Sequence, residues 1–415
     1  MITTRAELLA ALKPGARLEL ADGRYGALAL SRLADVQIAG GPGAVFDTVA
    51  LSEVDGVTLD GISVDWTPTG AKDTVVRVAA SKRVTLLGLK MRGGAVTQGV
   101  AGALSAEAVP PPPMNSFLVG HYAGRAAAIE FSEDVVVERC DISGFFQGVS
   151  VGKSSRVRIA ENHIHRLRTT PIKGGGTDVS IVRNLLEHMT PYRYVDPSTG
   201  KAAGDHFDFI HMYTGAGAPI TGLNIAENLL DAAGGEDAIG IYLQDKAQAG
   251  IIAPQVTENV ILTGRNEGVA LSEGVTDARV DGNVCLGPPG TLKPPTFVPR
   301  TATLASVSGN TWAENSTRPR HSETFPDNTY LPREAAPAEA VEAARAAWLQ
   351  RWRPAPAADP RDARIADLEV RAAELAARLA DAEAATAAGV RRLAEVIGER
   401  DALALRVEAA RAALA

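Results

Sequence analysis

The amino-acid sequence predicts an all-β chain wound into a parallel β-helix, and two observations carry this prediction. First, an asparagine recurs within a short apolar phrase, as in residues 157–164 and 223–230. Second, the phrases alternate apolar and polar residues with a period in the twenties, which is typical of one short strand per coil stacked on its neighbour. The recurring residues are Asn162, Asn184, Asn228, Asn259, Asn283 and Asn310, with Cys140 in the same place one coil earlier.

The spacing between these residues defines the expected coils. From Cys140 onward it is 22, 22, 44, 31, 24 and 27 residues, so we interpret the 44-residue step as two coils, one of which lacks the asparagine. Asparagine suits a solenoid turn because its side chain tolerates a left-handed bend and can bond the same residue one coil away. We therefore expect an asparagine ladder along the coils, with the coils ending near Trp312.

The chain is expected to have three segments. Residues 1–315 form the β-helix, and they open with a capping box, Thr4 to Glu7, that starts a helix expected to cover the open end of the first coil. Residues 316–360 form a linker with a helix from about Arg333 to Trp352. Residues 361–415 carry heptads with a and d positions from Ile365 to Leu414, which indicate an α-helical coiled coil for self-association, with an intrachain hairpin as the alternative.

Bulk properties narrow the class of partner. The net charge is −7 without a basic block, which argues against nucleic acid. The two cysteines, Cys140 and Cys285, lie at apolar strand positions and are expected to be buried thiols without a disulfide. We find neither a signal peptide nor an apolar stretch for membrane insertion. We therefore expect synthesis in the cytoplasm and action outside the cell as part of a particle released by lysis.

The histidines concentrate in one part of the chain, because six of the seven lie between His121 and His211. The densest stretch is Gly204–Gly215. Its strand, Asp208–Tyr213, resembles Asp237–Tyr242, and aligning the two sends Phe209, His211 and Tyr213 outward by strand alternation. In this alignment His211 has only small neighbours, Ser150, Gly240 and Ala270, while Tyr213 stacks on Tyr242 in the adjacent column.

Small residues around two phenols and an imidazole predict a shallow groove that suits sugar rings. Removing the C5 proton of a uronic acid requires a base, an acid and a cation that neutralises the carboxylate. The candidate catalytic residues are His211 or His206 as base, Tyr213 or Tyr242 as acid, and Arg168 or Lys173 as cation. The candidate substrate-binding residues are Asp205, Asp208, Tyr192, Arg193, Glu130 and Gln244, of which the last two belong to the expected groove.

Two further chemistries are weighed against proton abstraction. Hydrolysis requires paired carboxylates, and the candidates are Asp205, Asp208, Glu236 and Asp237, although Asp208 and Asp237 are expected to cap turns. A metal would need His206 and His211 to converge with the aspartates, and we predict no metal site. We expect no cofactor, with Ca²⁺ the one ion left open. His163 and His165 are expected to flank the Asn162 turn without a task.

The chain resembles the pectate-lyase-like right-handed parallel β-helix proteins over about residues 1–315. Its opening, Ala6–Leu12 followed by Leu20–Tyr25, looks like the start of chondroitinase-B and alginate-lyase-type sequences. The segment Asp205–Tyr213 is similar to an Asp-His-x-Asp-x-Ile-Gln segment of this superfamily, with His211 in place of the Gln, and distantly to the Asp-Pro-His motif of mannuronan C5-epimerases. Lyases, epimerases, hydrolases and phage spikes share this scaffold.

We therefore predict a protein that recognises, and degrades if it is an enzyme, an acidic surface polysaccharide as an oligomeric spike of a phage or phage-like particle. The alternative is a polysaccharide lyase or C5-epimerase acting on a uronic-acid polymer. A structural protein without enzymatic activity is the second alternative. The expected partners are a polysaccharide, further copies of the chain through its tail, and a particle structural protein.

Overall fold

The computed structural model describes residues 1–66, 74–93, 123–189, 191, 193–195, 202–205, 208–215, 218–232, 238–265, 267–287, 295–313, 324–331 and 338–352. By internal contacts the chain divides into Met1–Trp352 and Arg353–Ala415. The second unit lies outside the described residues, and the predicted coiled coil of residues 361–415 lies there with it.

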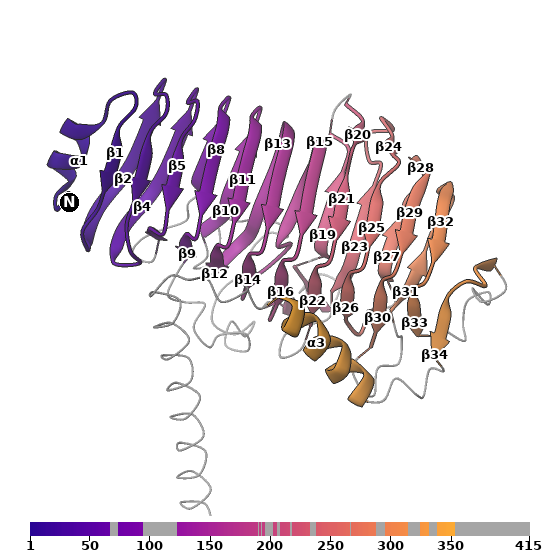
Figure 1. Cartoon of the computed structure of the whole chain (residues 1–415). Coiled ribbons are helices and arrows are strands. Elements are labelled where there is room, and N and C mark those ends of the chain that lie inside the picture. Colours follow the sequence, from indigo (N-terminus) through magenta and orange to yellow (C-terminus); the bar gives the residue numbers. More distant parts are fainter. Residues whose placement is uncertain are drawn as a thin grey trace, which may run out of the picture. The chain divides into compact units, whose positions relative to one another are not determined.

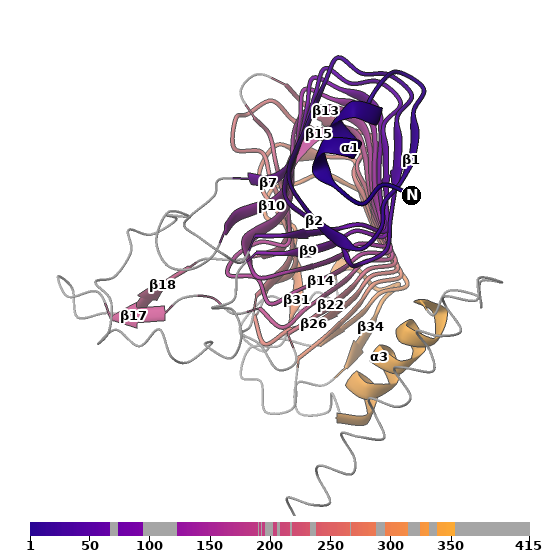
Figure 2. The same cartoon turned by 90° about the vertical axis from the view of Figure 1, so that its left-hand side faces the viewer.

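The described chain is a parallel β-helix, which confirms the predicted fold class. Its strands belong to one continuous sheet in which each strand pairs in parallel with the strand one coil before and after. The coil has three faces, and the apolar side chains between them form a continuous core from Leu8 to Trp312. Figures 1 and 2 show the stack from the side and from its end.

The first face carries the candidate groove. Its strands are β2 (Gly23–Ser31), β4 (Ala44–Ser52), β7 (Thr74–Ala79), β10 (Ala123–Glu130), the first half of β13 (Phe145–Ala160), the first half of β15 (Ile172–Val182), β19 (Asp208–Tyr213), β23 (Ile239–Gln244), β27 (Glu267–Leu271) and β31 (Thr296–Val298).

The second face continues from the first. Its strands are β1 (Arg17–Glu19), β3 (Gln37–Ala39), β5 (Thr58–Asp60), β8 (Lys82–Leu87), β11 (Glu133–Glu138), the second halves of β13 and β15, β20 (Ile220–Thr221), β21 (Asn224–Ala226), β24 (Ile251–Ile252), β25 (Gln255–Thr257), β28 (Val275–Thr276), β29 (Ala278–Asp281) and β32 (Leu304–Ser308).

The third face consists of short strands. They are β6 (Ser63–Asp65), β9 (Lys90–Arg92), β12 (Asp141–Ser143), β14 (His163–His165), β16 (Leu185–Glu187), β22 (Leu229–Asp231), β26 (Val260–Leu262), β30 (Val284–Leu286), β33 (Thr311–Ala313) and β34 (Thr329–Leu331). A separate antiparallel pair, β17 (Arg193–Val195) with β18 (Ala202–Gly204), lies in the second predicted insertion.

The asparagine ladder runs between the second and third faces, fully buried. In each step the backbone N–H and the side-chain amide of one asparagine both donate to Oδ1 of the next, at 3.1 and 2.9 Å for Asn162 on Asn184. Cys140 donates its N–H to Asn162 in the same way, at 2.9 Å. The asparagine itself is not the left-handed residue, however. That conformation falls on the residue before it, as at Glu161 (φ 56°) and Glu227 (φ 56°).

Two predictions about the coils are wrong. The 44-residue step is one coil, because the Asn184 N–H donates directly to Asn228 at 2.9 Å and β16 pairs with β22. The extra length belongs to the insertion that carries β17 and β18. The coils also continue beyond residue 315, into the expected linker, because Asn328 extends the ladder from Asn310 and β34 pairs with β33.

One described helix lies at the first coil and the other along the third face of the later coils. The capping box of α1 (Arg5–Ala11) forms as predicted, and Leu8 is buried in the core. Figure 2 shows α1 across the first coil. The second described helix, α3 (Ala338–Trp352), confirms the helix expected in the linker. It packs on the third face, where Val341 and Trp348 cover Leu229, Leu262 and Leu286. None of the described helices is long and apolar enough to cross a membrane.

Candidate functional site on the first face

The outward side chains of the first face form a column that defines the candidate site. Strand pairing places Ser150 beside Lys173, Lys173 beside His211, His211 beside Tyr242, and Tyr242 beside Ala270. The predicted alignment of Asp208 with Asp237 is therefore wrong by two residues. The immediate neighbours of His211 are a lysine and a tyrosine rather than small residues.

The alternation predicted for Phe209 also fails. Phe209 is fully buried in the core, although its neighbour His211 faces outward. The strand register places Gly240 and Gly268 at the same level in the next coils. A Cβ on Gly240 would meet Ile261, and one on Gly268 would meet Cys285, and both contacts are core residues. This column therefore faces inward, so Gly240 is not a groove residue.

His211 is held on both sides of its ring. Its Nδ1 lies 3.1 Å from Oδ2 of the buried Asp208, and its Nε2 lies 3.3 Å from the side chain of Gln244. Oδ1 of Asp208 has no hydrogen-bond partner among the described residues. Because an Nδ1–H donated to a carboxylate leaves Nε2 with the lone pair, this pairing favours the tautomer that can accept a proton at Nε2, in which Gln244 turns its amide NH₂ rather than its Oε1 toward that nitrogen.

Aromatic rings and one cation surround the imidazole. The rings of His211 and Tyr242 stack with centroids 4.9 Å apart, and Tyr213 lies at 5.3 Å with a tilt of 58°. Tyr242 therefore stacks on His211 within one column, and not on Tyr213, which pairs with Gln244. Nζ of Lys173 lies 5.7 Å from the centre of the Tyr213 ring. Burial lowers the pKa of Lys173, and attraction to Asp208 opposes this shift.

Two adjoining cavities lie beside these side chains. One has a volume of about 380 Å³ and the other about 630 Å³, and Tyr213, Gly152 and Gly174 line both. The first is polar on its floor, where Lys173 and Glu130 meet Arg125, and the second lies over glycines. His211 and Tyr242 continue the column next to the cavities without lining them. Together the two cavities and this column form an open groove. Charged side chains line one half of the groove, and glycines line the other half.

Arg168 and Asp205 occupy a different place from the one predicted. Their side chains are 2% and 3% exposed and form a bidentate ion pair, with Arg168 Nε 2.7 Å and Nη2 2.8 Å from the Asp205 carboxylate. The guanidinium also lies 5.0 Å from the centre of the Phe146 ring. In this structure neither side chain presents its charge to a substrate, and their pairing fixes the end of the insertion to the preceding coil.

The remaining candidates separate into three groups. Glu130 lines the first cavity and pairs with Arg77 at 2.9 Å, and Gln244 lies beside Tyr213. Arg193 lies in β17, of which the structure describes the backbone alone. His206, Tyr192, Glu236 and Asp237 lie outside the described residues. The structure thus brings together His211, Tyr213, Tyr242, Lys173, Asp208, Gln244 and Glu130.

Some groove residues were missed from the sequence. Arg125, Gln147 and Thr170 line the first cavity beside Lys173. Arg125 and Gln147 are the third residues of β10 and β13, and Thr170 lies two residues before β15, so their positions depend on where the strands begin rather than on alternation. The equivalent starts of β10 and β13, which the register places side by side at Arg125 and Gln147, are the signal that would have located them.

No protein-family model matches the chain, and no curated protein is significantly similar to it. Among solved structures, the chain is similar to the surface adhesin PfbA of Streptococcus pneumoniae (14% identity, TM-score 0.48, 73% of this chain and 79% of that one). It is also similar to an alginate lyase from Paenibacillus sp. str. FPU-7 (13%, 0.43, 73% and 96%) and to DFA-IIIase from Arthrobacter chlorophenolicus A6 (13%, 0.42, 80% and 79%). At these values the similarities carry no argument about the activity of this chain.

Proposed function

We propose that the groove binds an acidic polysaccharide and removes the C5 proton of a uronic-acid unit, as a polysaccharide lyase or C5-epimerase. The observation that carries the proposal is the Asp208–His211 pair, in which a buried carboxylate orients an imidazole toward an aromatic, partly cationic groove. A buried anion beside a general base stabilises the imidazolium that forms when the base takes a proton.

Each step of β-elimination can be assigned to one side chain of the groove. Lys173 neutralises the uronate carboxylate, which makes the C5 proton more acidic. Nε2 of His211 takes that proton, the electron pair of the C5–H bond forms the C4–C5 double bond, and the C4–O bond breaks. Tyr213 donates its phenolic proton to the leaving oxygen. In an epimerase, the same phenol would return a proton to the opposite face of C5 and no bond to oxygen would break.

Recognition without cleavage is the second candidate. The stacked rings of His211 and Tyr242, with centroids 4.9 Å apart, offer a flat surface to the C–H face of a sugar whether or not a proton moves. Hydrolysis is less well supported, because the described candidates Asp208 and Asp205 are each paired with a cationic or imidazole group rather than with a second carboxylate.

We also propose that the chain acts as an oligomeric spike of a phage or phage-like particle. The support for this setting is the run of heptads in residues 361–415. It is independent of the groove chemistry, and it is tested by the oligomeric state rather than by activity.

The experiment is to incubate the full-length protein with alginate, pectate and chondroitin chains. Chain length, ultraviolet absorbance of unsaturated ends and C5 configuration by NMR are followed together. Shortening with new absorbance establishes a lyase, and inverted C5 centres establish an epimerase. Binding without either change would show that the groove recognises the chain without reacting with it. Shortening without new absorbance would indicate hydrolysis and contradict the proposal.

Two variants connect the activity to the groove. His211→Gln keeps a polar side chain but cannot transfer the proton, so turnover should fall by about 10²-fold or more. Arg17→Gln is the control, because Arg17 is exposed in β1 of the second face, away from the groove. Equal activity of the two variants would place the proton transfer outside the groove.

A further inference from the structure

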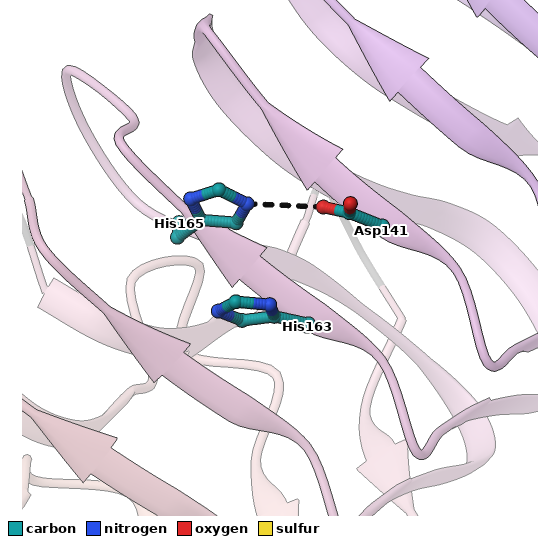
Figure 3. Close-up of side chains that lie close together, drawn as sticks. All are labelled: Asp141, His163 and His165. Atoms are coloured by element: carbon teal, nitrogen blue, oxygen red, sulfur yellow. Dashed lines mark hydrogen bonds and ion pairs between the residues drawn. The ribbon is translucent and has the colours of Figure 1, made fainter. Parts of the chain in front are cut away.

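Four polar side chains meet on the third face, away from the groove. Asp141, His163 and His165 lie on the neighbouring strands β12 and β14, and Glu187 lies on β16 next to them. Strand pairing places Asp141 beside His163, and His165 beside Glu187. Because the central residue of each three-residue strand is in the core, the first and third residues both point outward. Figure 3 shows three of these side chains.

The distances within this cluster are short. Nε2 of His165 lies 3.0 Å from Oδ1 of Asp141, and Nε2 of His163 lies 2.8 Å from Oε1 of Glu187. The two imidazole rings stack with centroids 4.2 Å apart and an angle of 17°. One donor atom each from Asp141, His163 and His165 lies within 4.8 Å of the other two.

This donor set suits a transition metal. Two imidazole nitrogens and one carboxylate oxygen are ligands that Zn²⁺ takes in tetrahedral sites with water in the fourth position, at about 2.0–2.2 Å from the ion, which places the ligand atoms about 3.4 Å from one another. The donor atoms of Asp141, His163 and His165 therefore need to approach by about 1.4 Å at most, which side-chain rotation provides while the strands stay in place. Ca²⁺ prefers oxygen ligands throughout and suits the cluster poorly.

The surroundings orient the donors and set the local charge. Arg92 binds both oxygens of the Asp141 carboxylate, with Nη1 3.0 Å from Oδ1 and Nη2 on Oδ2, and Nδ1 of His188 lies 3.4 Å from Oε2 of Glu187. Such outer contacts fix the ligands of metal sites. Arg92 opposes a cation, but two carboxylates and one guanidinium leave one net negative charge. The cluster is half-buried, with His165 15% and Glu187 22% exposed.

We propose that Asp141, His163 and His165 form a binding site for a divalent transition-metal ion, with Zn²⁺ as the best fit, and that Glu187 orients His163. The ion would replace the hydrogen bond between His165 and Asp141 with coordinate bonds to three side chains and would link the coils of β12 and β14. The site adjoins the position at which α3 is attached, because Glu187 pairs with Asp231 and Arg345 of α3 binds Asp231. Its role is therefore structural and separate from the groove.

The test uses full-length protein without a histidine tag, treated with chelator and then titrated with Zn²⁺ by calorimetry. We expect one ion per chain and a Tm that rises with Zn²⁺ concentration. Co²⁺ in place of Zn²⁺ should give the visible spectrum of a tetrahedral nitrogen–oxygen site. No binding by the native chain, or an equal response to Ca²⁺, would overturn the proposal.

Variants assign the ion to these residues. The double variant His163→Gln/His165→Gln should lose at least 100-fold in Zn²⁺ affinity, and His211→Gln should bind as the native chain does because it lies on the first face. Asp141→Asn keeps the shape of the carboxylate side chain and should also weaken binding, which covers the case in which the double variant does not fold. Unchanged affinity in both cluster variants would place the ion elsewhere.

Discussion

Single residues of this protein bury polar groups at very different cost. Asn228 is fully buried, and its side-chain amide donates to Ile181, to Ala226 and to Asn259 while its oxygen accepts from Asn184. Every hydrogen-bonding group of that side chain is therefore satisfied, and burial costs little. Lys173 is different, because burial in the groove lowers its pKa and penalises its charge.

Replacing one member of the ladder should destabilise the coil. Asn228→Leu removes the acceptor of the buried Asn184 N–H and one of the acceptors of the Asn184 side-chain amide, so we expect a loss of about 1–3 kcal/mol in the free energy of unfolding. Urea unfolding measures it. Asn224→Leu, on the half-exposed second face of the same coil, is the control and should change stability by about 0.5 kcal/mol or less. Equal effects would contradict a structural role for the ladder.

The charge of Lys173 should make stability depend on pH. Its pKa is lowered in the folded chain, so the unfolded chain binds this proton more tightly, and the charged lysine costs stability below the folded-state pKa. The cost disappears as the pH rises to the ordinary lysine value of about 10.4. Lys173→Met should therefore raise Tm at neutral pH and lose that gain near pH 10.4.

The control for this comparison is Lys153→Met, because Lys153 is an exposed residue of β13, the strand that pairs with β15. It should give no gain that depends on pH. A Tm difference for Lys173→Met that is the same at both pH values would show that lost packing, and not charge, separates it from the native chain.

At this scale the sequence predicted the outward positions of His211 and Tyr213, but not the buried position of Phe209 or the partners of these residues. A shift of two residues between neighbouring strands leaves the same side chains facing outward, so alternation alone cannot separate Asp208 beside Asp237 from the observed Asp208 beside Ile239. The metal cluster was missed for another reason. Asp141 directly follows Cys140, and His163 directly follows Asn162. The repeat therefore already indicated that Asp141 and His163 lie side by side in neighbouring coils.

Among the elements, α3 has the least expected position. Its helical pattern was predictable, but its contact with the third face was not, because its own alanines give no strong apolar stripe. The signal lay in the strands instead. Leu229, Leu262 and Leu286 occupy outward positions where a solvent-exposed strand would carry polar residues, and α3 covers them. The capping box of α1, by contrast, depends on residues four apart at most and was evident from the sequence.

Trp348 should account for much of the attachment of α3. It is 6% exposed, donates from Nε1 to the Glu227 carbonyl at 2.7 Å, and stacks on Trp352. Trp348→Ala should weaken the packing by about 3–5 kcal/mol and make α3 sensitive to limited proteolysis. Gln350→Ala, at an exposed position of the same helix, should leave the cleavage pattern unchanged. Resistance of both variants would mean that Arg345 and Val341 hold the helix without Trp348.

For the whole molecule, the period and the asparagines were enough to predict the fold, since each coil contacts its neighbours and repeats one local pattern. The length of the 44-residue step was not predictable in this way. An insertion and a coil without asparagine have the same length in the sequence, and the direct pairing of β16 with β22 distinguishes them.

Removing residues 361–415 tests the predicted self-association. The truncated chain should retain the β-rich circular dichroism of the native chain, because α3 and the coils end before the deletion. Its mass by light scattering should fall to that of a smaller oligomer or a monomer. The same oligomer before and after truncation would show that the heptads do not mediate association.

The position of α3 also divides the solenoid into two parts whose coils should open in different ways. The helix shares one apolar cluster with outward residues of five strands between Leu185 and Leu331, and the coils before them lack this cover in the described chain. Opening one covered coil therefore requires releasing contacts to several others at once, while an earlier coil can open with its neighbours alone. In native-state hydrogen exchange, the backbone amides beneath α3 should exchange together as one cooperative unit, and those of the first coils should exchange earlier and coil by coil.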